Sequence, residues 1–181
     1  MAYLLGFACH YILDSKCHSF IYQLEESGVI SHTAVEKELD RYLMEKSGLN
    51  PYSYYPAHII RPKVRYARTI HKLMPEVSTD SIMKALRGMK FYTKLMVHDD
   101  GGKKRFLVSI FSKVAGKENS EMATDFFMAK DPVPGSRVPV AHLVSLFKDA
   151  VEEAPDLLVE LYQLLEEPRE LSERWNRTYN G

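Results

Sequence analysis

Metal-capable side chains recur at helical spacing within the first forty residues of this chain. Each of two groups contains three imidazole or carboxylate side chains that are spaced four residues apart. On a helix, the three side chains of a group would share one face. The groups are His10, Asp14 and His18, and then His32, Glu36 and Asp40. Imidazole nitrogens and carboxylate oxygens are ordinary zinc ligands. If two such faces meet, they can enclose a metal ion, and the spacing predicts this chemistry.

Each group also has an explanation that needs no metal. His10 and Asp14 lie in or just after the apolar stretch Leu4–Leu13. An isolated carboxylate there would be costly to bury, but a hydrogen bond between the two side chains or a partner arginine would satisfy it as well as zinc. Thr33–Glu36 fits a capping box, in which the glutamate only reaches back to the start of its helix. Asp40 lies on a charged helix, and we expect it at most to support a ligand.

The composition is that of an ordinary folded protein. Of 181 residues, 45% are hydrophobic and 27% are charged, which predicts one domain over residues 1–181 and argues against disorder. Lys plus Arg equals Asp plus Glu at 24 each, so no overall field attracts nucleic acid, and we expect no nucleic-acid partner. No stretch has the pattern of a transmembrane segment or a signal peptide. We therefore expect a cytoplasmic protein.

The two cysteines do not form a disulfide framework. Cys9 and Cys17 are eight residues apart on one predicted helix, about 12 Å along its axis and beyond disulfide reach. We expect both to be buried thiols, which fits a reducing compartment.

Helical periodicity dominates the chain, and no stretch alternates as a sheet strand would. The pattern predicts an all-α fold, a multi-helix bundle. The predicted helices are 2–24, 31–46, 62–73, 78–97, 103–114, 140–167 and 168–176. Gly28 and Gly48 are expected to follow the first two helices, and Pro155 to kink or break the sixth. Residues 117–139 form the longest irregular stretch, a candidate cover for a site.

Other polar residues have ordinary explanations. A basic stripe at helical intervals could hold a phosphate-bearing substrate, although a solvated helix face is the more common reason for such a pattern. Its members are Arg61, Arg65, Arg68 and Lys72. The remaining histidines have few ligand types at helical spacing, and we expect them to serve packing or to lie on the surface. They are His58, His71, His98 and His142.

The chain starts directly inside its first predicted helix. That helix is apolar on nearly every side from Met1 onward, so it should lie within a core. We expect the natural domain to begin further upstream. An uncovered apolar face here would favour a homodimer or a partner chain that covers the first helix.

Taken in order, these residues resemble the bacterial zinc-dependent phospholipase C domain. The segments that carry the resemblance are Leu4–His18, His32–Glu36 and Glu38–Arg41. That family has a His-x-x-x-Asp pair on one helix, a further histidine shortly after it, and a His-x-x-x-Glu pair on the next helix. The resemblance is strong over residues 2–45 and weak thereafter.

The resemblance implies a role for each residue. His10 and Asp14 would be ligands of a coupled zinc pair, with Asp14 as the bridging catalytic carboxylate. His18, His32 and Glu36 would be the protein ligands of the remaining zinc. The implied reaction is hydrolysis of a phosphodiester, with a phospholipid headgroup type of substrate. Because the family takes further ligands from a segment before the first helix, we expect this domain to be N-terminally incomplete.

A rival hypothesis belongs to a different functional class. The same residues could form a structural zinc site or a buried polar network in a non-catalytic helical protein, in which case removing the metal would cost stability but no activity. The two hypotheses differ in metal content and in phosphodiester hydrolysis before and after chelation.

Overall fold

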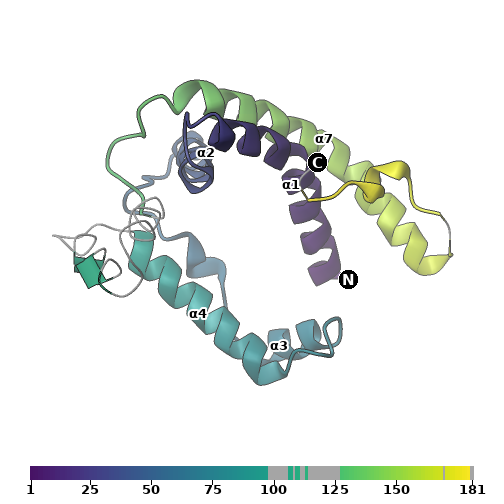
Figure 1. The fold of residues 1–181 in the computed structure, drawn as a ribbon. Helices are drawn as coiled ribbons and strands as arrows, with labels where there is room; N and C mark the ends of the chain where they lie inside the picture. Colours follow the sequence, from purple (N-terminus) through teal and green to yellow (C-terminus); the bar gives the residue numbers. More distant parts are fainter. Residues whose placement is uncertain (98–105, 108, 111–112, 114–126, 169, 180–181) are drawn as a thin grey trace. The chain divides into compact units, whose positions relative to one another are not determined.

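The computed structural model describes residues 1–97, 106–107, 109–110, 113, 127–168 and 170–179. Its α-helices are α1 (Ala2–Glu26), α2 (His32–Lys46), α3 (Val64–His71), α4 (Thr79–Val97) and α7 (Arg137–Glu166) (Figure 1). The 3-10 helices are η1 (Pro56–Ile59) and η2 (Glu173–Asn176). No strand occurs among the described residues, so the all-α prediction is confirmed. None of the helices found there is both long and apolar enough to cross a lipid bilayer.

Local signals in the sequence set several helix ends. Gly28 and Gly48 follow α1 and α2 with φ of 69° and 71°, a conformation that glycine adopts without a steric penalty. At the start of α4 the Ser78 hydroxyl accepts a hydrogen bond of 3.1 Å from the Ser81 amide and caps the helix. The first, second and fourth predicted helices are therefore confirmed to within about two residues.

The prediction for the end of the chain is wrong. The helix predicted over 168–176 does not form, and η2 is the only helical turn in its described part. Pro155 was expected to kink or break the sixth helix; it lies inside α7, which continues on both sides, so a break is excluded and a kink stays a prediction. The predicted helix 103–114 and residues 117–126 of the predicted irregular stretch lie largely outside the described residues. The described remainder of that stretch has no helix over 127–136, and α7 begins at Arg137, three residues before the predicted position.

Contacts between Cα atoms divide the chain into two compact units. The terminal unit comprises residues 1–39 and 133–181, and the middle unit comprises residues 40–132. Each is described here by itself, and the single domain expected over residues 1–181 stays a prediction.

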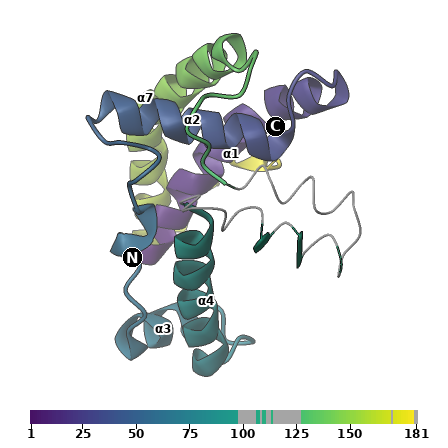
Figure 2. The same ribbon diagram turned by 90° about the vertical axis from the view of Figure 1, so that its left-hand side faces the viewer.

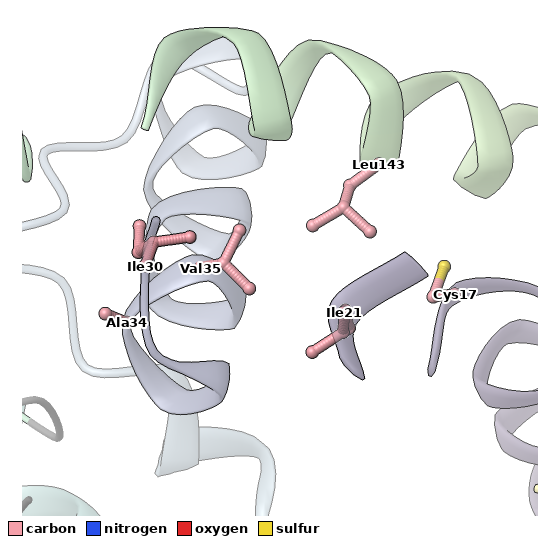
Figure 3. Close-up of a cluster of buried hydrophobic side chains, with 6 residues drawn as sticks. All are labelled: Cys17, Ile21, Ile30, Ala34, Val35 and Leu143. Atoms are coloured by element: carbon pink, nitrogen blue, oxygen red, sulfur yellow. The ribbon is translucent and has the colours of Figure 1, made fainter. Parts of the chain in front are cut away.

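A small apolar cluster holds α1, α2 and α7 together in the terminal unit (Figure 3). Its buried members are Cys17 and Ile21 of α1, Ile30 of the connection, Ala34 and Val35 of α2, and Leu143 of α7. The Leu143 side chain extends from α7 toward those of α1 and α2, and it is fully buried, as is Val35. Burial of these side chains fixes the distance between the first two helices.

The C-terminal segment binds back onto α1. The Trp175 ring stacks on the Tyr11 ring at a centroid distance of 5.6 Å and an angle of 10°. The Tyr11 hydroxyl donates to the Arg177 carbonyl at 2.7 Å. The Arg174 guanidinium donates to the Ser15 hydroxyl at 2.9 Å. These side chains explain why residues 168–176 are not a helix: their partners lie on α1, and tertiary contacts override local propensity.

A charged network joins the same segment to α7. The Glu153 carboxylate accepts a hydrogen bond from Arg174 Nε at 2.9 Å and lies 3.0 Å from Lys16 Nζ on α1. Burial alone would raise the pKa of Glu153, but the hydrogen bonds from Lys16 and Arg174 outweigh it and hold the pKa below its ordinary value. The carboxylate is thus charged when it links the three segments.

The burial predicted for the first helix is wrong for its first turns. Phe7 is half exposed, and Cys9 and His10 are exposed. Among the aromatic rings of the described residues, that of Tyr179 packs against Phe7. Cys9 is therefore not the buried thiol that we expected. Cys17 is buried and free, and burial, helped by the negative charges of Asp14 and Glu36, raises its pKa to about 11.

In the middle unit, α3 lies against α4 (Figure 2). Ala67 of α3 and Ile82 and Met83 of α4 are the buried residues of their interface. Elsewhere in this unit, the Arg41 guanidinium is buried and donates to the carbonyls of Ala129 and Asp131, at 2.6 and 3.2 Å.

Leu143 provides a test of the cluster in the terminal unit. Leu143→Ala should lower the free energy of unfolding by about 2–5 kcal/mol, because it removes buried methyl groups and leaves a cavity between three helices. Urea denaturation measures this change. Val138→Ala, on the same helix at a position that is 78% exposed, is the control and should cost less than about 0.5 kcal/mol. Equal effects of the two substitutions would contradict the assigned core.

Glu153 provides a test of the charged network through pH. Its folded pKa lies below the ordinary value of 4.5, so its charge contributes stability above pH 4.5 that is lost as the pH falls through the folded pKa. Glu153→Gln should therefore lower Tm at pH 7, and its difference from wild type should shrink below pH 4.5. Thermal melts from neutral to acidic pH measure both, with the exposed neighbour Glu152→Gln as control. A difference that does not change with pH would count against the network.

Candidate metal centre

His18 of α1 and His32 and Glu36 of α2 bring three ligand atoms together. All three atoms lie within 4.8 Å of one another. His32 Nε2 is 3.1 Å from Glu36 Oε1, and His18 Nε2 is 3.7 Å from the same oxygen. Two separate helices therefore supply three zinc-type donors to one point.

The residues beside these donors explain why they meet. Cys17 immediately precedes His18, and Ala34 and Val35 lie between His32 and Glu36; all three neighbours belong to the buried cluster of the terminal unit. The apolar side chains pull α1 and α2 together, and the polar side chains next to them are left at the edge of the core. There His18 keeps 17% of its side-chain surface, His32 26% and Glu36 47%.

The start of α2 decides against the capping box suggested by Thr33. The Ala34 amide donates to the Ser31 hydroxyl at 3.3 Å, so Ser31 provides the cap and His32 is the first helical residue. Glu36 is then too far along the helix to complete a capping box from Ser31. Its carboxylate contacts the two imidazoles instead.

The donor set fits zinc by its chemistry and nearly by its geometry. Ligand atoms at about 2.1 Å from a tetrahedral zinc are about 3.4 Å from one another. The separations of 3.7 and 3.1 Å between Glu36 Oε1 and the Nε2 atoms of His18 and His32 lie on either side of this value. Small rotations of these partly exposed side chains would suffice for coordination.

Two further residues surround the imidazoles and were missed by the sequence analysis. Glu25 Oε2 lies 3.9 Å from His32 Nδ1, the ring nitrogen opposite the one that faces Glu36. The Tyr22 ring packs edge-on against His18 and His32, at centroid distances of 5.7 and 5.6 Å. Spacing could have found both, because Tyr22 and Glu25 follow His18 by four and seven residues on the same helical face.

The environment of His18 differs from that of His32. His18 Nδ1 is buried and has no hydrogen-bond partner among the described residues. A histidine that coordinates a metal through one nitrogen normally donates a hydrogen bond through the other. For His32 the Glu25 carboxylate stands on that side, whereas for His18 the described residues supply no acceptor.

The structure does not join the first pair of predicted ligands to this cluster. His10 Nε2 lies 3.1 Å from Asp14 Oδ2, which is the internal contact that the sequence allowed as an explanation without metal. The His10 side chain is 63% exposed. Among the described residues, only His18, His32 and Glu36, here called the His18 cluster, bring three possible donors close enough together to hold a metal. The ligand roles of His10 and Asp14 therefore stay predictions.

The other histidines within the described residues have the packing or surface roles that we expected. His58 and His71 contact the carbonyls of Tyr55 and Val77 through Nδ1, each at 2.8 Å. His142 packs its ring against Phe20 at 4.4 Å. His98 lies outside the described residues.

Comparison with known protein families gives a match to the family described as zinc-dependent phospholipase C, over residues 1–87. Comparison with curated proteins and with solved structures gives no match. The matched stretch contains α1 and α2 with the whole His18, His32 and Glu36 cluster. The resemblance to the zinc-dependent phospholipase C family is therefore confirmed over residues 1–87, a little less than half of the chain.

Proposed function

We propose that this chain binds zinc through His18, His32 and Glu36 and hydrolyses phosphodiesters of the phospholipid type. The observation that carries the proposal is the convergence of these three donors within 4.8 Å, on helices that belong to a zinc-dependent phospholipase family. Three protein ligands are the number typical of catalytic zinc sites, which keep a fourth position for water or substrate. Structural sites usually fill that position with a fourth side chain.

The side chains at the site have distinct tasks in this proposal. His18 and His32 present Nε2 as neutral donors, and the Glu36 carboxylate completes the set from the solvent side. With zinc on Nε2, His32 would carry its proton on Nδ1, the nitrogen that faces the Glu25 carboxylate at 3.9 Å. When bound, zinc supplies a Lewis acid that activates water near neutral pH and polarises a phosphoryl oxygen.

Electrostatics makes substrate binding depend on the metal. Glu25 and Glu36 are both acidic, and they are the carboxylates that contact the imidazoles. A phosphodiester is itself an anion, so these carboxylates repel it unless a cation stands between them. Metal removal should therefore abolish substrate binding as well as turnover.

His10 and Asp14 extend the proposal to a second metal position. They contribute two donors held 3.1 Å apart, with Asp14 as the catalytic, bridging carboxylate that the family resemblance assigns. Two donors do not make a zinc site, so this position needs ligands beyond those of the His18 cluster. We propose that the two positions differ in affinity, with the His18 cluster the tighter.

A structural zinc site is the second candidate. The observation in its favour is that the donors come from two different helices, so a bound metal would cross-link α1 to α2. Such a metal would raise stability through its own binding free energy, without any reaction.

The expected partners follow from the exposed start of α1. Tyr3 and Phe7, which are four residues apart on one face of α1, are 37% and 50% exposed, so two large apolar side chains there remain in contact with water. A homodimer or a partner chain that covers this face stays a prediction, and so does the cytoplasmic location.

Zinc content tests the ligand set. Protein purified without added zinc should hold at least one zinc per chain by elemental analysis. His32→Ala should lower both the zinc content and Tm, because it removes a ligand and with it the link between the helices. His58→Ala, on an exposed histidine of the middle unit, is the control and should change neither. Unchanged zinc and unchanged Tm in His32→Ala would exclude its role as a ligand. His10→Ala reports separately on the second position.

Phosphodiester hydrolysis distinguishes the two candidates. The zinc-loaded chain should hydrolyse a chromogenic p-nitrophenyl phosphodiester, lose this activity with a chelator and regain it with added zinc. His18→Ala should lower the rate at least 100-fold, because the activated water depends on the metal. Zinc binding with no hydrolysis in the wild-type chain would favour the structural site. A normal rate in Asp14→Asn would remove Asp14 from the catalytic role.

A further inference from the structure

Charge is distributed unevenly along a chain whose formal net charge is zero. Residues 61–94, which contain α3 and most of α4, hold nine Lys or Arg and two Asp or Glu, a formal charge of +7. The rest of the chain must then carry −7. All of this positive charge lies in the middle unit. At physiological salt, charges act over about 8 Å, so a partner at this surface responds to the local +7 and not to the net charge.

One exposed stripe of α4 combines three cations with one phenylalanine. Lys84, Arg87, Phe91 and Lys94 are spaced by three, four and three residues, so they form one stripe along the helix. All four are exposed, and Phe91 is 61% exposed. Among the residues that the structure describes, none forms an ion pair with the three cations of this stripe. Ile82, on the opposite side of the helix, and Met83, at the border of the stripe, are buried against α3.

The basic stripe that the sequence indicated on α3 is also exposed. Its residues are Arg61, Arg65, Arg68 and Lys72. Ala67, between them, is fully buried against α4, so the helix turns its small residue inward and its long cationic residues to solvent. Both helices of the hairpin therefore expose positive charge.

Large apolar side chains are exposed on the same hairpin. Met89 and Tyr92 of α4 are 60% and 57% exposed, and Val64 of α3 is 49% exposed. Leu73 and Met74, after α3, are 49% and 38% exposed. A solvated helix face explains the cations but not these residues, because each leaves apolar area in water.

We propose that the α3–α4 hairpin docks on the surface of an anionic phospholipid bilayer. The cations would lie at the level of the phosphates, and the Phe91 ring among them would enter the boundary between headgroups and acyl chains. Exposed Lys and Arg interleaved with exposed aromatic and aliphatic residues are the features of helices that lie in this interface. The proposal concerns a surface of the middle unit and does not depend on the zinc site.

The side chains favour a bilayer over a nucleic acid. Single-stranded nucleic acid is bound by aromatic faces on which bases stack, together with cations that follow the backbone. Here much of the exposed apolar surface is aliphatic, from Met89, Val64, Leu73 and Met74, and offers nothing to a base. The Phe91 and Tyr92 rings also pack edge-on against each other at 5.5 Å. A bilayer can take up exposed aliphatic and aromatic side chains alike.

Vesicle sedimentation tests the proposal with the full chain and EDTA present, so that neither zinc nor hydrolysis contributes. The chain should bind vesicles that contain about one third phosphatidylserine and not vesicles of phosphatidylcholine alone. The double variant Arg87→Gln, Lys94→Gln should bind about thirty-fold more weakly, since each cation near the membrane surface contributes about one factor of five. Phe91→Ser should weaken binding even at high salt, where the electrostatic part is screened.

Matched controls separate this surface from a general charge effect. Arg137→Gln with Lys148→Gln removes the same charges from exposed positions of α7, in the other unit, and should change binding less than threefold. Equal loss in the two double variants would overturn the proposal, as would equal binding to neutral vesicles. Tighter binding to single-stranded DNA than to anionic vesicles would assign the surface to nucleic acid instead. Circular dichroism melts confirm that each variant is folded.

Discussion

The packing of α1 against α2 is the constraint on which the candidate metal centre depends. Imidazoles on two different helices reach one another only when the helix axes are held close, and polar side chains cannot provide this by themselves because bringing them together costs hydration. Ile21, Val35 and Leu143 provide it by burying apolar surface beside the donors. The free energy that assembles the site thus comes from residues that take no part in its chemistry, and the metal only has to bind donors that are already near each other.

The sequence predicted best where structure depends on neighbours along the chain. The ends of α1, α2 and α4 follow from Gly28, Gly48 and Ser78, whose effects act within one turn. The C-terminal segment failed for the opposite reason. Trp175 and Arg174 bind Tyr11 and Ser15, some 160 residues earlier, and no local pattern contains that information. Pro168 indicated a helix start, but a start signal has little weight when the following side chains have partners elsewhere.

The distinction between local signals and long-range contacts applies to the candidate metal centre as well. Spacing fixed which side chains share a helical face and gave two groups of three, and the family resemblance combined His18 with His32 and Glu36 as the ligands of one zinc. Spacing could not fix the position of α1 along its axis relative to α2, which decides whether His18 or His10 meets the second helix. Glu25 and Tyr22 are predictable in the same way, because Tyr22 lies one turn and Glu25 two turns after His18 on the same face. The supporting residues of a metal site are as periodic as its ligands.

The prediction of no nucleic-acid partner rests on an average over the whole chain, and such an average does not describe a local surface. Equal totals of acidic and basic residues describe the field only at distances larger than the protein, and salt removes that field beyond about one Debye length. At contact, a bilayer or any other partner meets only the charges of one face, and the +7 of residues 61–94 is concentrated on a short helical hairpin. Solubility alone does not explain the surface of this hairpin, because polar residues in place of the exposed Phe91 and Met89 would increase solubility further. Charge counted along each helix face is therefore a better guide to partners than charge counted over the chain.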